Sequence, residues 1–135
     1  MAWSFTSRAP VYMQIVSRIR ADILGGVYQP DQQIPAVRQL ALTAGVNPNT
    51  MQRAFAVLEA EQLFITRGTI GRFITTDTEV LARAREVMRR ETVARLIEEA
   101  AAVGISPAEL IESIRAYESE TAAEKAEASQ ETDTQ

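Results

Sequence analysis

The segment Pro35–Ile74 constrains the fold more than any other part of this chain, because it predicts short elements in a fixed order. Apolar residues recur at helical spacing over 36–44, and Gly45 stands where the end of a helix favours a left-handed residue. Asn47 and Pro48 then make a helix start, with a good N-cap before a proline at the first helical position. The two predicted helices are therefore joined by a very short turn.

A β-hairpin is predicted after the second of these helices, which extends to about Glu61. The runs 63–66 and 72–75 are rich in β-branched and aromatic residues, and they flank a tip that contains two glycines. Two short helices, a tight turn and a hairpin form a winged helix-turn-helix, whose second helix of the pair enters the major groove of DNA. The predicted fold class is mainly α with a small β-hairpin.

Helical patterns also precede and follow this segment. Apolar residues recur at helical spacing over 11–24 and over 79–103, and Ser106 with Glu109 forms a capping box that opens a last helix. From about residue 118 the chain has no aromatic or large aliphatic residue. We therefore expect a winged helix-turn-helix domain at 1–76, a two-helix C-terminal dimerisation segment at 77–117 and a disordered acidic tail at 118–135.

The composition argues against several classes of function. The chain has no cysteine and no histidine, so it lacks a thiolate metal site, the commonest general base and the commonest metal ligand. We expect no catalytic residues, no metal and no cofactor. No apolar run is long enough to span a membrane, and the N-terminus does not resemble a signal peptide, so a cytoplasmic protein without a membrane partner is the expectation.

The charge of the chain is divided between its two halves. Residues 1–76 carry seven arginines against four acidic residues, whereas residues 77–135 carry seven basic residues against fourteen acidic ones. The net charge of −4 therefore does not exclude double-stranded DNA as a partner, because the local field at the contact surface matters more than the total.

The polar residues around the second helix of the pair suit DNA recognition. Asparagine and glutamine can pair with adenine, arginine can pair with guanine, and helix N-termini bind phosphate. Arginines beside a thin glycine-containing tip suit a minor groove. The predicted DNA-binding residues are Arg38, Asn47, Asn49, Thr50, Gln52, Arg53, Arg67, Gly68, Thr69, Gly71 and Arg72.

Each of these residues also has a purely structural interpretation. Asn47 could be only a helix cap, Arg53 only a solvated surface residue, and Arg72 only a cover for the hairpin strand. Gly68 and Gly71 could serve only the turn. A winged helix that binds protein without specific DNA binding is the alternative function, but such a helix would begin with apolar or acidic residues rather than with asparagine, threonine, glutamine and arginine.

The motifs together resemble the GntR family of bacterial transcription regulators. The similarity rests on Pro35-x-x-Arg38-x-Leu40-Ala41, on Ala54-Phe55-x-x-Leu58-Glu59 and on Gly71-x-Phe73-Ile74. Val46-Asn47-Pro48-Asn49-Thr50 and the short C-terminal segment resemble its YtrA subfamily. The chain departs from the family pattern at Asp31, Ala36 and Gln62, where the usual residues are Gly, Ser and Gly. The resemblance implies a repressor, with transporter operons as targets.

A homodimer is the second expected partnership, because two helices alone cannot bury both of their apolar stripes. Two copies would form a closed four-helix interface matching an inverted-repeat operator. A small-molecule effector of unknown identity, if one exists, would lie at that interface or at the domain junction. The predicted dimer-interface residues are Leu81, Ala84, Val87, Met88, Ala94, Ile97, Ala101, Leu110, Ile111, Ile114 and Tyr117.

Overall fold

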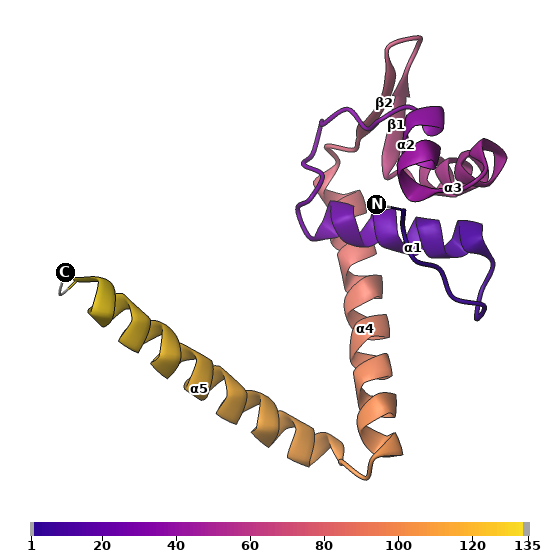
Figure 1. The fold of residues 1–135 in the computed structure, drawn as a ribbon. Helices are drawn as coiled ribbons and strands as arrows, with labels where there is room; N and C mark the ends of the chain where they lie inside the picture. Colours follow the sequence, from indigo (N-terminus) through magenta and orange to yellow (C-terminus); the bar gives the residue numbers. More distant parts are fainter. Residues whose placement is uncertain (1, 134–135) are drawn as a thin grey trace. The chain divides into compact units, whose positions relative to one another are not determined.

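The helices and the hairpin occur in the predicted order along the chain (Figure 1). The structure is a computed structural model that describes residues 2–133. Its predicted fold class, mainly helical with one antiparallel hairpin, is confirmed. The elements are α1 (Val11–Leu24), α2 (Val37–Ala44), α3 (Pro48–Ala60), β1 (Phe64–Arg67), β2 (Gly71–Ile74), α4 (Thr78–Ala102) and α5 (Pro107–Asp133).

The core forms where α1, α2 and the hairpin pack around α3. Phe55 of α3 is fully buried, and its ring meets the edge of Phe64 with the centroids 5.1 Å apart. Burial of this apolar surface is the main source of stability for the domain. The other largest fully buried side chains are Ile15, Ile19, Met51, Leu58, Leu63 and Ile74.

The turn between α2 and α3 follows from the capping residues. Gly45 ends α2 in the left-handed conformation, with φ of 76°. The Asn47 side chain accepts a hydrogen bond of 2.8 Å from the Asn49 N–H, and Pro48 fills the first turn of α3. Ala36 precedes α2 and offers no side-chain cap, so the N-terminus of α2 keeps unpaired backbone donors.

A short segment before α2 adds a third strand-like piece to the hairpin. Within the hairpin, Phe64 pairs with Ile74. Gln33 forms an isolated antiparallel bridge with Phe73. The Ile34 N–H also donates to the Arg72 carbonyl at 3.0 Å. The hairpin, which we call the wing, is therefore fixed to the segment 31–34 along β2.

The turn after α3 has Gln62 where the family pattern has glycine, and its backbone is strained at that residue. Gln62 has φ of 67°, a left-handed conformation that side chains with a Cβ rarely adopt. We expect Gln62→Gly to raise the free energy of unfolding by about 0.5–1 kcal/mol, since relief of strain exceeds the added freedom of the unfolded chain. Urea denaturation measures the change. Gln62→Ala keeps the Cβ and should give no such gain; an equal gain would contradict the argument.

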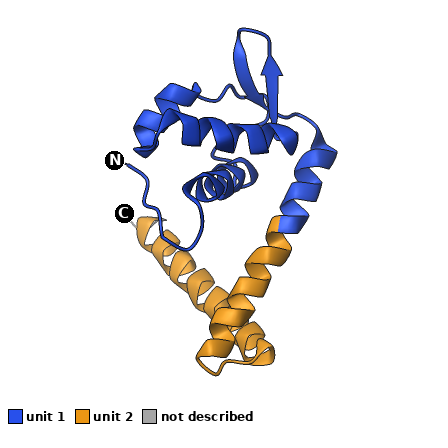
Figure 2. Ribbon diagram, turned by 90° about the vertical axis from the view of Figure 1, so that its right-hand side faces the viewer, with its two compact units in different colours: residues 1–87 blue, residues 88–135 orange. Residues whose placement is uncertain are grey.

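The chain divides into two compact units, unit 1, which ends at Val87, and unit 2, which begins at Met88 (Figure 2). This boundary lies beyond the predicted domain end at 76, because the start of α4 packs on the winged-helix core. Val80 is buried in that core, and Leu81 and Ala84 are partly buried against it. The first turns of α4 therefore belong to the winged-helix unit.

The C-terminal segment differs from the disordered tail predicted at 118–135. Helix α5 continues to Asp133, and residues 134 and 135 lie outside the described part of the chain. The segment is rich in alanine and glutamate, with Lys125 and Gln130 among them, and all of these residues have high helix propensity. Low apolar content excludes a packed core here, but it does not exclude a solvated helix.

Candidate nucleic-acid interface

The outer face of α3 presents a stripe of exposed polar side chains. Asn49, Gln52 and Arg53 are exposed. The small residue Ala56, one turn after Gln52 and Arg53, is exposed as well. The opposite face, which carries Met51, Ala54, Phe55 and Leu58, is fully buried. The burial of one face therefore fixes which side chains α3 turns outward, and those are amides, a guanidinium and a methyl group, all of which can contact base edges.

Two residues of the predicted set have structural partners on this helix. Asn47 is exposed but caps α3 through its side-chain oxygen, so its capping role is confirmed. The Arg53 guanidinium lies over the Tyr12 ring, 3.8 Å from the ring centroid. This cation–π contact joins the exposed stripe to α1. Thr50, the remaining predicted residue of α3, is half-buried.

Arg38 lies exposed in the first turn of α2. Among residues 2–133, it forms no ion pair. A hollow of about 400 Å³ separates this helix start from the wing tip, lined by residues 33–38 and 69–72. A free guanidinium beside uncapped backbone N–H groups is suited to a phosphate oxygen.

The two wing arginines are held by carboxylates that the sequence reasoning did not identify. Arg67 forms an ion pair with Asp31, and its guanidinium lies 4.4 Å from the centroid of the Phe73 ring. Arg72 pairs with Glu59 of α3. These partners are distant in sequence, but the departure from glycine at Asp31 was a signal that this turn carries an additional side chain.

The wing tip depends on Gln33, a further residue that the sequence reasoning missed. The Gln33 side-chain amide donates a 2.8 Å hydrogen bond to the Ile70 carbonyl. A Cβ built on Gly71 would lie only 2.8 Å from the same amide nitrogen. Gly71 therefore makes room for the Gln33 side chain, whereas a Cβ on Gly68 would meet no atom within 4 Å. Thr69 between them is exposed.

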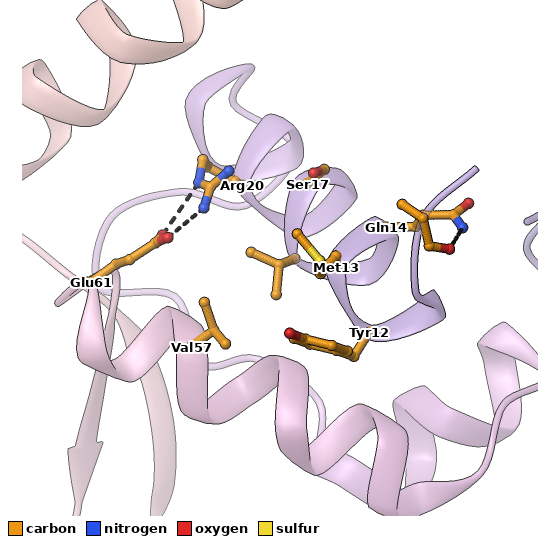
Figure 3. Close-up of a pocket in the computed structure, with 9 residues that line it drawn as sticks. Tyr12, Met13, Gln14, Ser17, Arg20, Val57 and Glu61 are labelled. Atoms are coloured by element: carbon orange, nitrogen blue, oxygen red, sulfur yellow. Dashed lines mark hydrogen bonds and ion pairs between the residues drawn. The ribbon is translucent and has the colours of Figure 1, made fainter. Parts of the chain in front are cut away.

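A second hollow, of about 510 Å³, lies between α1 and α3 (Figure 3). Tyr12 and Met13 of α1 face Val57 of α3 across it, and the ion pair of Arg20 with Glu61 lies at one end. Its walls are mainly apolar. None of the residues predicted to bind DNA lines this groove.

The residues predicted for dimerisation fall into both units. Leu81 and Ala84 pack on the winged-helix core and are only partly available. Val87, Ala94, Ile97, Ala101, Ile111, Ile114 and Tyr117 are exposed, and Met88 and Leu110 are half-buried. Val93 and Leu96 of α4 are also exposed, although the predicted set omitted them. An apolar surface this extensive is typical of a contact site.

No helix between residues 2 and 133 is both long enough and apolar enough to cross a membrane.

Comparison with known proteins identifies the family. The family described as bacterial regulatory proteins, gntR family, matches residues 11–74. The HTH-type transcriptional repressor YtrA of Bacillus subtilis (strain 168) is 31% identical over 110 residues, which cover 81% of this chain and 85% of that protein. These relatives are regulators and not enzymes, in agreement with the expectation from the sequence.

Solved structures agree with this assignment. A GntR family transcriptional regulator from Listeria monocytogenes shares 30% identity and superposes with a TM-score of 0.72, over 82% of this chain and 97% of that one. The AraR DNA-binding domain in complex with operator ORX1 shares 26% identity, with a TM-score of 0.50, over 56% of this chain and 99% of that one. The chain therefore belongs to the GntR family of bacterial transcription regulators, as a YtrA-like member.

Proposed function

We propose that this protein is a homodimeric, sequence-specific repressor that binds an inverted-repeat operator. The observation that carries the proposal is the exposed stripe of Asn49, Gln52, Arg53 and Ala56 on a helix whose other face is fully buried. Such a helix can lie in a major groove and present hydrogen-bonding groups to base edges. The similar protein YtrA of Bacillus subtilis is named a transcriptional repressor, which supports repression rather than activation.

The phosphate contacts come from residues around that helix. Arg38 is free for a phosphate, and the wing presents Arg67 and Arg72 once their carboxylate partners release them. Phosphate contacts position a protein on DNA, while base contacts give it specificity. Positive charge in residues 1–76 favours this surface for DNA over the acidic C-terminal part.

The reason to infer a dimer is that unit 2 has several large apolar side chains exposed to solvent. Ile97 and Leu96 of α4 and Ile111 and Ile114 of α5 are exposed within that unit. A second copy related by a two-fold axis would cover the same side chains on both subunits. The two winged helices would then face two half-sites about one helical turn apart.

Selection of bound fragments from the source genome tests the proposal and gives the operator. The selected fragments should share an inverted repeat, and affinity for them should fall steeply with salt because bound arginines release counterions from the DNA. Binding without sequence preference, or no binding at low salt, would refute it. In that case the winged helix would be a protein-interaction module instead.

Single substitutions should separate base reading from positioning. We expect Gln52→Ala and Asn49→Ala to cost about 1–3 kcal/mol each at particular operator positions, and to leave other positions unchanged. Arg38→Ala should weaken operator and random DNA alike and reduce the salt slope by about one. Binding titrations against single-base operator variants measure both effects.

Arg83→Ala is the matched control for the loss of charge. Arg83 is exposed on α4, outside the proposed DNA interface. Its substitution by alanine should leave both the salt slope and the base preference unchanged. If Gln52→Ala, Asn49→Ala and Arg38→Ala all keep wild-type affinity in folded protein, α3 is not the reading helix.

A further inference from the structure

We propose that Asp31 restrains the wing: its carboxylate holds Arg67 away from DNA phosphates and so weakens binding to operator and random DNA alike. This inference rests on the proposed function, because it assigns a role to a residue beside the proposed DNA surface. The role belongs to the Asp31 carboxylate, which does not itself contact DNA in the proposed complex. It accounts for the pairing of Asp31 with the wing residue Arg67.

The backbone fixes Asp31 beside the wing. The Asp31 N–H donates to the Ile74 carbonyl at 2.9 Å, and the Ile74 N–H donates to the Gln32 carbonyl at the same distance. The Asp31 backbone is therefore anchored to β2, while Arg67 ends the neighbouring strand β1. The ion pair therefore joins the wing to the segment 31–34.

Arg67 is held from two directions. Its Nη2 pairs with the Asp31 carboxylate, and its guanidinium plane lies against the Phe73 ring. To contact a phosphate, this guanidinium must either leave the carboxylate or bring the carboxylate close to the phosphate. The first choice breaks an ion pair and the second places two negative charges together, so both oppose binding.

The restraint is weak enough to be overcome at an operator. The side chains of Arg67 and Asp31 are 46% and 56% exposed, and water screens ion pairs at such sites. Binding to random DNA depends almost entirely on phosphate contacts, whereas operator binding also gains base contacts from α3. Because the same ion pair must break in both complexes, the carboxylate costs about the same free energy in each and lowers both affinities by a similar factor.

The chain offers a conservative variant and a matched control. Asp31 has φ of 67°, a left-handed conformation that asparagine also tolerates, so Asp31→Asn removes the charge and keeps the backbone. Glu61→Gln removes one negative charge from the same domain and weakens a different ion pair, the one with Arg20 (Figure 3). Glu61 lines the groove between α1 and α3, and its partner is Arg20 of α1 rather than a wing arginine.

The experiment measures affinity for a genome-selected operator fragment and for a random duplex, between about 50 and 200 mM salt. We expect Asp31→Asn to bind the random duplex about fivefold more tightly than wild type, with a salt slope steeper by about one. The operator affinity should rise by a similar factor, so the ratio of the two affinities should stay near that of wild type. In an Arg67→Ala background the same substitution should have a smaller effect, since the paired guanidinium is gone.

Each other outcome overturns the proposal. Weaker binding by Asp31→Asn would mean that the pair positions Arg67 for DNA, and an unchanged salt slope would mean that Arg67 gains no phosphate contact when the pair is removed. An equal gain from Glu61→Gln would mean that net charge alone sets the affinity. If wild type binds neither duplex at low salt, the proposed function fails together with the restraint. If wild type binds the operator but Asp31→Asn behaves as wild type, only the restraint fails.

Discussion

Removal of residues 88–135 is expected to leave a folded monomeric domain that loses operator affinity about 10²–10⁴-fold. The cut keeps Val80, Leu81 and Ala84, which pack on the winged-helix core, so the free energy of unfolding of that domain should change little. Affinity falls because the second half-site is no longer linked to the first. The number of contacts made by each winged helix is unchanged.

The loss of dimerisation has a specific physical reason. Unit 2 leaves Leu96, Ile97, Ile111 and Ile114 exposed, and only a second copy of the same helices would cover them symmetrically. Sedimentation at micromolar concentration, for the full-length chain and the truncated chain, measures the change directly. A monomeric full-length chain, or a truncated chain that stays dimeric, would show that the interface lies elsewhere.

A shorter truncation is the matched control. Removal of residues 121–135 deletes charged and small residues but no aromatic or large aliphatic side chain. This variant should remain dimeric and should keep wild-type operator affinity. Dissociation of this variant would mean that the end of α5 contributes to the interface through its charges.

Sequence reasoning predicts the local elements of this protein well because their signals are local. Asn47 and Pro48 mark the start of α3, and the hydrogen bond from the Asn49 N–H confirms that assignment. Gly45 marks the end of α2 in the same way. Each signal depends on neighbouring residues alone, so one sequence is sufficient to find it.

The parts that sequence reasoning missed depend on contacts between distant residues. Asp31 and Arg67 lie 36 positions apart, and their pairing becomes visible only when the wing folds against the segment before α2. The packing of Val80 on the core was not visible in the sequence for the same reason, because Val80 continues a helical pattern whether it packs on the core or faces water. Exposure of the α3 stripe was predictable from helical spacing, whereas the stacking of Arg53 on Tyr12 was not.

Phe55→Ala is expected to lower the free energy of unfolding by about 3–5 kcal/mol, a large fraction of what a domain of this size has. Phe55 is fully buried, meets Phe64 edge to face, and has the Arg72 guanidinium 5.3 Å from its ring centroid. Its removal leaves a cavity between α3 and the wing. Urea denaturation measures the loss, and Phe55→Leu, which retains most of the apolar volume, should cost less than half as much.

The same substitution separates folding from recognition. Phe55 is fully buried in the core, whereas Gln52 is exposed, so Phe55 does not contact DNA in the proposed complex. At a temperature where Phe55→Ala is still folded, its base preference should match wild type, and its affinity should fall only by the fraction unfolded. Altered base preference in folded Phe55→Ala would show instead that the cavity moves α3 against the wing. The packing of Phe55 on Phe64 would then set the geometry with which the two elements meet DNA.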